Sequence, residues 1–242
     1  MQNAAVQEFD ARTQGRDSGL AGLLCGYRFW ICEDPASFSA ALAVRRDVYV
    51  GDFGYDVPVP DEYDARSWLL VAESAADGQI AGTMRITPRA FGPLEAEEYF
   101  RLPAALASGR CIEISRFAIR RSHRKTHTFL PIVSLGLFKL CYEFALALGA
   151  ECQVVCSKPE RMWSYLSMGF RSTGITARYE KLNGVEHELL WHDFRQAGTI
   201  LQGNPFRELF CALQFEEVAL PAAPPPVGLV EELEPLRFAV GA

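Results

Sequence analysis

The spacing of apolar residues predicts a helix and then a hairpin in the first third of the chain. Asp34-Pro35 offers an N-cap with a proline at the first helical position, and apolar side chains then recur every three or four residues. This pattern predicts a helix from about 35 to 50. Two apolar, strand-like runs, 67–74 and 79–86, are joined by Ala-Asp-Gly, a tight-turn signal, so they should form a hairpin.

The segment 110–119 alternates like a strand, yet it places a charged residue on each face. A regular strand would separate its side chains into two sets: Ile112, Ile114, Arg116 and Ala118 against Cys111, Glu113, Ser115, Phe117 and Ile119. A solvated strand would keep its charges on one side. Glu113 and Arg116, each among apolar neighbours, therefore call for a chemical explanation.

A long apolar helix is predicted next, over about 130–149. Its only charged residues are Lys139 and Glu143, four positions apart, which predicts one narrow exposed stripe on a nearly enveloped helix. The run 129–150 approaches the length of a membrane span, but two charges near its centre favour a buried core helix.

The last third predicts a strand, a helix and a second antiparallel pair. The run 152–157 is a short apolar strand, 159–168 a helix closed by Gly169, and the segments 171–182 and 186–194 pair across Asn183-Gly184. Asn204-Pro205 caps a further helix, and the proline run 221–226 joins a short amphipathic tail.

This order of elements predicts an α+β fold with a mixed sheet. Strands 110–119 and 152–157 should form a parallel pair around the crossover helix, and the carboxyl ends of such a pair can splay into a cleft. We expect one domain over 27–218, a loose leader over 1–26 and a proline-linked tail over 219–242.

Composition narrows the class of protein. The chain has 242 residues, 49% of them hydrophobic, which is enough for a substantial core. A net charge of −6 argues against a protein whose whole surface binds nucleic acid. The seven cysteines are scattered without a CxxC pair or zinc-ligand spacing, and the N-terminus has no apolar signal core, so we expect reduced thiols, no metal and a cytoplasmic location.

Four separated motifs occur in order: Arg45 with Tyr49 and Tyr55, the DEYD of 61–64, Arg85 in GTMRITP, and the EISRF of 113–117. Together they resemble the GNAT-fold acyltransferases, in particular the acyl-homoserine-lactone synthases and the related N-acyl amino acid synthases. The second half looks more like the N-acyl amino acid synthases, through the YLSMGF of 165–170 and the hairpin after it. Tyr55 stands where the lactone synthases usually have tryptophan, which weighs against a lactone product.

The resemblance implies a GNAT-like fold and a role for the alternating strand. Aminolysis of a thioester needs a proton acceptor and hydrogen-bond donors for the oxyanion. The resemblance implies that Glu113 is the base, while an ion pair with Arg85 or Arg116 is the structural alternative. It also implies backbone oxyanion donors at a bulge near 117–119.

Two further residues are candidates for the catalytic steps. Ser115 is a candidate for orienting the substrate or its sulfur. Tyr165, which matches the GNAT tyrosine, either protonates the departing thiolate or only packs.

The acidic motif has two interpretations. Asp61 and Asp64 either belong to a solvated loop or pair with Arg45, Arg85 and Arg116 in a buried network beside the acceptor pocket. Substrate contacts are expected from a set of residues that also includes Tyr49, Tyr55 and Phe117. An acyl tunnel would be lined by apolar residues that serve equally well as core: Phe117, Leu130, Ile132, Phe138, Trp163 and Phe170.

The loop after the strand carries four positive charges and no glycine. GNAT enzymes that use coenzyme A normally place a glycine-rich turn here, but this chain has Arg120, Arg121, Arg124 and Lys125. The loop is either a solvated basic turn or a docking surface for an acidic acyl carrier protein. Nucleic acid is disfavoured because aromatics are not interleaved.

These observations predict an N-acyltransferase that moves a medium or long fatty acyl group from acyl carrier protein to the α-amine of an amino acid. The donor substrate would be the acyl-phosphopantetheine of the carrier, with no bound cofactor. A lactone synthase using S-adenosylmethionine, a GNAT-fold module that binds without turnover, and an acetyl-CoA-dependent acetyltransferase remain open alternatives.

Overall fold

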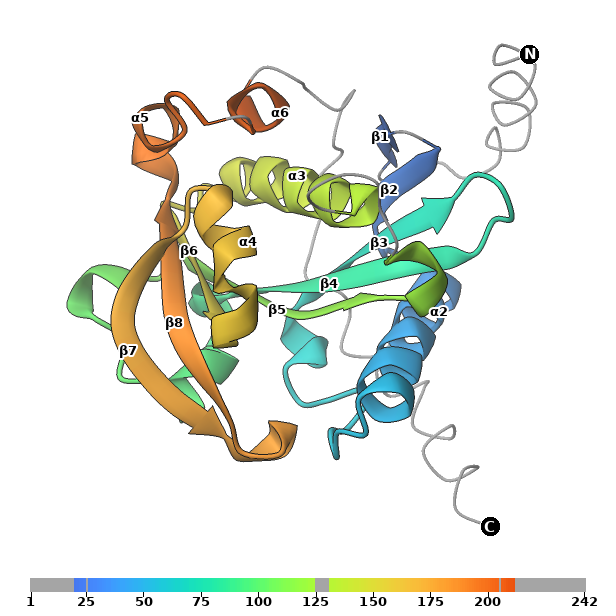
Figure 1. Ribbon diagram of the computed structural model, residues 1–242, viewed down its shortest axis with the longest axis horizontal. Coiled ribbons are helices and arrows are strands. Elements are labelled where there is room, and N and C mark those ends of the chain that lie inside the picture. Colours follow the sequence, from blue (N-terminus) through green and yellow to red (C-terminus); the bar gives the residue numbers. More distant parts are fainter. Residues whose placement is uncertain (1–19, 25, 125–130, 205, 212–242) are drawn as a thin grey trace.

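The computed structural model describes residues 20–24, 26–124, 131–204 and 206–211 (Figure 1). These residues form one eight-stranded sheet in the order β1-β2-β3-β4-β5-β6-β8-β7. The strands are β1 Leu20–Leu24, β2 Tyr27–Ile31, β3 Trp68–Ser74, β4 Ile80–Pro88, β5 Cys111–Ile119, β6 Cys152–Ser157, β7 Arg171–Tyr179 and β8 Val185–Asp193. Every neighbouring pair is antiparallel except β5 and β6, which confirms the predicted mixed sheet with one parallel pair.

The two N-terminal strands were not predicted from the sequence. Strand β1 lies inside the segment expected to be a loose leader, where it pairs with β2. Residues 1–19 and the tail over 219–242 lie outside the described residues. The predicted hairpin of β3 and β4, and that of β7 and β8 with Asn183 in the left-handed conformation, are both confirmed.

Helices cover both faces of the central strands. They are α2 Pro35–Arg46, α3 Ile132–Ala147, α4 Met162–Ser167, α5 Ala197–Ile200 and α6 Arg207–Cys211. Helix α3 packs on one face and α2 on the other (Figure 1). The Asp34 carboxylate caps α2 by accepting from two backbone N–H groups at 2.9 Å. The segment between β4 and β5 contains short 3-10 turns, among them Glu95–Glu98 and Ala104–Leu106.

Helix α2 continues into a π-helical turn, Asp47–Asp52, rather than ending in regular α-helix. This turn and the loop after it lie against β5, where Tyr49 donates a long hydrogen bond to the Phe117 carbonyl at 3.4 Å. The turn therefore brings the aromatic residues that follow α2 to the middle of the sheet.

Close contact between α3 and the sheet depends on Gly136. A Cβ atom at this position would lie 2.0 Å from the Phe29 ring of β2. The helix therefore sits directly on an aromatic side chain that comes from the strand region missed in the sequence.

The expected exposed stripe on α3 is wrong at Lys139. Its side chain is buried, with an Nζ–Oε1 ion pair of 2.8 Å to Glu143 and a hydrogen bond of 3.2 Å to the Phe210 carbonyl. Helix α6 packs on this side of α3 and removes the lysine from water. The sequence pattern of α3 alone could not reveal that a later helix covers it.

Strand β5 contains a bulge that changes which way its side chains point. Ser115 pairs with Arg85 and Ala118 with Thr83, so residues 116–117 stand opposite a single residue of β4. Arg116 has φ of 51°, in the left-handed region. Regular alternation therefore ends here, and the bulge lies next to the predicted position near 117–119.

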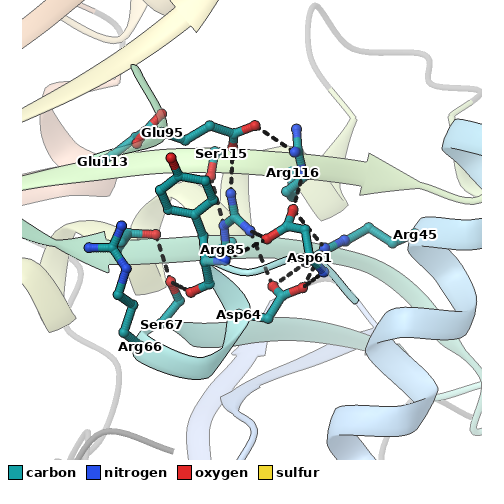
Figure 2. Close-up of polar contacts among 12 residues, drawn as sticks. Arg45, Asp61, Asp64, Arg66, Ser67, Arg85, Glu95, Glu113, Ser115 and Arg116 are labelled. Atoms are coloured by element: carbon teal, nitrogen blue, oxygen red, sulfur yellow. Dashed lines mark hydrogen bonds and ion pairs between the residues drawn. The ribbon is translucent and has the colours of Figure 1, made fainter. Parts of the chain in front are cut away.

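The bulge overturns the face assignment made from strict alternation. Arg116 points to the side of Glu113 and Ser115, where its ion pairs lie (Figure 2). Phe117 and Ile119, expected on that side, instead pack toward α3, with the Phe117 and Phe138 rings 5.4 Å apart. Both charged residues of the strand thus share one face.

Strands β5 and β6 pair only at their beginnings. Their register runs from Cys111 with Cys152 to Ile114 with Val155 and then stops, while β6 continues to pair with β8 as far as Ser157. The two carboxyl ends therefore diverge, as predicted for a splayed parallel pair.

Two general expectations can be compared with the described residues. Five of their cysteines, Cys32, Cys111, Cys141, Cys152 and Cys156, are free thiols. Within the ranges given above, none of the helices has both the length and the apolar character that crossing a bilayer would require.

Candidate active site

A cavity of about 600 Å³ opens where β5 and β6 separate. Its wall includes Glu113 and Ser115 from β5, Cys156 from β6 and Tyr165 from α4. A carboxylate, a hydroxyl, a thiol and a phenol therefore share a site of the size that small-molecule substrates occupy.

A buried network of charges supports one side of this cavity (Figure 2). Arg45 of α2 binds Asp64 through two parallel hydrogen bonds, Nη1–Oδ1 and Nη2–Oδ2, both of 2.7 Å. Arg85 of β4 binds Asp61, and its Nη1 lies 3.3 Å from Asp64 Oδ1. All four side chains are buried, so the solvated-loop interpretation of the acidic motif is wrong.

The network extends to the bulge through Glu95, a residue that the sequence analysis missed. Arg116 Nε lies 2.8 Å from Asp61 Oδ2, and the Glu95 carboxylate bridges Arg85 and Arg116. Glu95 begins the 3-10 turn Glu95–Glu98. Several glutamates occur in that stretch, and without the fold no feature distinguishes the one that turns inward.

The charge network reaches the cavity through two residues, Arg116 and Glu95, which line it. Arg45, Asp61, Asp64 and Arg85 are not among the described residues that line the cavity. The ion pairs place these four behind Arg116 and Glu95. These four residues therefore hold Arg116 and Glu95 in place in the cavity wall.

Glu113 lies beside this network but is not part of it. Three arginines face three acids, and within the described residues Glu113 forms no ion pair with Arg85 or Arg116. Its Oε2 accepts a hydrogen bond from the Ala96 backbone N–H at 3.3 Å. The structural ion pair considered from the sequence is therefore wrong.

The surroundings of Glu113 favour its neutral form. Burial, and after it the negative charge of Glu95, raises the pKa of Glu113 from 4.5 to about 8. By contrast, burial pushes the pKa of Asp61 upward, but Arg85, Arg45 and Arg116 outweigh it and lower that pKa. Two neighbouring acids thus behave differently, and a carboxylate that titrates near neutral pH suits a general base.

Ser115 and Tyr165 both face the cavity. Ser115 Oγ accepts a hydrogen bond of 3.0 Å from Arg85 Nε, which leaves the hydroxyl proton for another partner. Tyr165 packs edge-on against Phe138 and Phe170, with ring centroids 5.6 and 5.5 Å away, and burial raises its pKa.

The second half of the chain contributes residues to which the sequence gave no role. Lys158, Tyr179 and His187 line the cavity. The Lys158 ammonium donates a hydrogen bond to the Tyr55 hydroxyl. Continuing the alternation of β6 one residue past its end would have placed Lys158 on the same face as Cys156, which is the only sequence signal for it.

The opposite end of the cavity is apolar. Of the tunnel candidates, Phe117, Phe138 and Trp163 line it, together with Ile119 and Met168. Leu130 lies outside the described residues. Phe170 packs in the core that includes α3.

The basic loop is partly neutralised by the π-helical turn. Arg120 forms an ion pair with Asp47 and Arg124 with Asp52, while Arg121 is exposed. Arg124 also lines the cavity. Lys125, the fourth predicted docking residue, lies outside the described residues.

No cluster of three or more His, Cys, Asp or Glu side chains suited to a metal ion occurs in the part of the chain that the structure describes. The polar groups of the cavity can instead exchange protons and form hydrogen bonds with an organic substrate.

Comparison with known proteins places these features in a family context. The model of the family "N-acyl amino acid synthase FeeM" matches residues 40–193. No curated protein matches the chain.

Three solved structures share the fold at low sequence identity. FeeM, an N-acyl amino acid synthase from uncultured soil microbes, has 18% identity and a TM-score of 0.57, covering 73% of this chain and 96% of FeeM. BjaI, a CoA-dependent acyl-homoserine lactone synthase solved with SAM and isopentyl-CoA, has 18% identity and a TM-score of 0.54, covering 82% and 91%. A putative N-acetyltransferase from Lactobacillus plantarum has 16% identity and a TM-score of 0.52, covering 70% and 99%. The predicted GNAT-like fold is thereby confirmed.

Proposed function

Because the chain belongs to the FeeM family of N-acyl amino acid synthases and is therefore an N-acyltransferase, we propose that it moves a medium or long fatty acyl group from acyl carrier protein to the α-amine of an amino acid. The observation that carries this proposal is Glu113, a buried carboxylate without an ion-pair partner among the described residues, which lines the cavity next to the point where β5 and β6 separate.

Glu113 is the proposed general base. Its pKa of about 8 lets it hold a proton from the acceptor amine while that amine attacks the thioester carbonyl. The new C–N bond then forms, and the carbonyl oxygen becomes an oxyanion.

The β5 bulge is the proposed source of oxyanion donors. Residues 116 and 117 stand opposite one residue of β4, so their backbone N–H groups are not all used by regular strand pairing. The Ser115 hydroxyl, which accepts from Arg85, has a proton to donate to the substrate or to its sulfur.

Collapse of the intermediate breaks the C–S bond and releases a thiolate. Tyr165 is the proposed acid for this step, since burial raises its pKa and keeps the phenol protonated. The apolar end of the cavity, with Phe117 and Phe138, is the proposed place for the acyl chain.

The remaining candidate substrate residues fall into two groups, those that line the cavity and those that lie behind its wall. Tyr49 and Tyr55 line the cavity and are proposed to contact substrate. We assign Arg45, Asp61, Asp64 and Arg85 a positioning role, in which they hold Arg116 and Glu95 in the wall.

The carrier protein is proposed to dock beside Arg120, Arg121, Arg124 and Lys125. Arg124 and the half-exposed Phe53 both line the cavity. The Arg124 Cζ atom lies 5.2 Å from the centre of the Phe53 ring. An acidic carrier would meet positive charge here, although Asp47 and Asp52 reduce that charge. A carrier-dependent donor also fits a cytoplasmic location.

The decisive experiment supplies purified protein with acyl carrier protein thioesters of several chain lengths and each of the twenty amino acids. We expect release of the free carrier thiol and a product that retains a carboxylate, with little release by Glu113→Gln. Absence of thiol release with every amine would refute the proposal.

The fold shared with BjaI makes acyl-homoserine lactone formation the second candidate. Mass spectra of lipid extracts from expressing cells distinguish the two, because a lactone has no free carboxylate. Replacing the carrier thioester by acyl-CoA in the purified reaction tests the donor.

A further inference from the structure

The cavity wall contains a positive charge that the charge network does not neutralise. Arg116 and Arg124, two of the cations that line the cavity, are paired with acids. Lys158 lines it as well, and among the described residues its ammonium has no carboxylate partner. A half-buried cation facing a substrate cavity indicates a place for a negatively charged group of the ligand.

The ammonium of Lys158 is held in a defined position. It donates to the Tyr55 hydroxyl and lies 4.8 Å from the centre of the Tyr55 ring. Tyr55 is itself buried and stacks on Phe53, with ring centroids 5.5 Å apart. Neither contact neutralises the charge, so both orient the group without satisfying it.

A second observation points to the same place. Tyr179 lines the cavity wall and is buried, with 4% of the residue exposed. Among the described residues its hydroxyl has no nitrogen or oxygen partner and interacts only with the neighbouring Cys156 thiol, a weak hydrogen-bonding group. Its ring is fixed by stacking on Tyr99 at 3.9 Å. A buried hydroxyl with only a thiol beside it is poorly satisfied, so a ligand oxygen that accepts from it is the natural partner.

These two groups lie along the wall from Glu113. In the β5–β6 register Glu113 is paired with Val154, and Cys156 and Lys158 follow at alternate positions. Tyr179 lies close enough to Glu113 to feel its charge. A zwitterion would therefore place its amine at the acidic end and its carboxylate at the basic end of one wall.

We propose that Lys158 and Tyr179 bind the α-carboxylate of the acceptor, so that the enzyme selects free amino acids over amines that lack a carboxylate. This inference rests on the proposed function and adds the specificity-determining residues. Lys158 supplies a charge-assisted hydrogen bond, and Tyr179 donates a second one.

The test compares an accepted amino acid with its own carboxamide at equal side chain. For the wild type we expect kcat/KM to favour the acid about 10- to 100-fold, the range of one charge-assisted hydrogen bond. In Lys158→Met this preference should fall to within about 3-fold, mainly through a higher KM for the acid. Lys158→Arg should retain most of it, and Tyr179→Phe should reduce it partially.

Lys181→Met is the matched control, because Lys181 pairs with Glu98 on the surface and is absent from the cavity wall described here. It should leave the preference unchanged.

A wild-type enzyme that acylates acid and carboxamide equally well would overturn this inference while leaving acyl transfer intact. An unchanged preference in folded Lys158→Met would overturn it too. If no amine is acylated at all, the proposed function itself fails.

Discussion

Replacing Glu113 by glutamine separates the catalytic and the structural consequences of one carboxylate. The change keeps the side-chain size and an oxygen that can accept from the Ala96 N–H, but it removes the charge. We expect acyl transfer to fall at least about 100-fold, in line with removal of a general base. We also expect the free energy of unfolding to increase.

The size of the stability gain follows from the pKa. Because the pKa of Glu113 is raised from 4.5 to about 8 in the folded protein, the native state binds this proton more tightly than the unfolded state between those values. The free energy of unfolding of the wild type therefore decreases as pH rises through this window. At about 1.36 kcal/mol per pH unit, the difference from Glu113→Gln grows from about 1 kcal/mol at pH 5 to about 4 kcal/mol at pH 8.

Denaturant unfolding of both proteins at pH 5, 6.5 and 8 measures this difference. Glu95→Gln is the control in the same cluster, since Glu95 bridges two arginines and its neutralisation should destabilise by about 3–5 kcal/mol. Opposite signs for two buried glutamates are the expected result. A Glu113→Gln protein no more stable than the wild type at pH 8, or a gap that does not widen with pH, would refute the assignment of Glu113 as the unpaired acid.

Further predictions concern rate and packing. The rate of acyl transfer should rise with pH through about 8, as Glu113 loses its proton. In pH–rate profiles of Glu113→Gln this rise should be absent. In Glu95→Gln the midpoint should lie below 8, because the charge of Glu95 contributes to raising the Glu113 pKa; an unmoved midpoint would assign the whole effect to burial. Gly136→Ala should destabilise by about 3 kcal/mol or more by driving a methyl into Phe29, whereas Gly198→Ala, with nothing within 4 Å, should change stability by less than about 0.5 kcal/mol in the same unfolding assay.

The elements with local signals could be read from the sequence. The proline at the start of α2, the turn residues of both hairpins and the long apolar run of α3 each encode structure within a few residues. The parallel pair followed from the order of these elements, because a crossover helix between two strands leaves few alternatives. The gap between β5 and β6 followed in turn.

What failed depended on contacts between distant segments. Strict alternation put Arg116 on the wrong face. The β5 bulge depends on pairing with β4 and on the ion pairs of Arg116 with Asp61 and Glu95. Lys139 was expected to be exposed, because the sequence of α3 alone does not show that α6 covers it. Lys158 belongs to no motif, and Tyr179 lies in a hairpin whose resemblance gave it no role. Both reach the site only when β6, β8 and β7 assemble in the sheet.

The charge balance of the network explains why Glu95 matters to the proposed chemistry. With only Asp61 and Asp64 available, the three arginines would carry one excess positive charge, and Glu113 would be the nearest acid to neutralise it. Such an ion pair would lower the pKa of Glu113 and weaken it as a base. Glu95 occupies Arg85 and Arg116 instead and adds a repulsive negative charge. The residue that the sequence analysis missed is therefore the one that leaves Glu113 free to accept a proton.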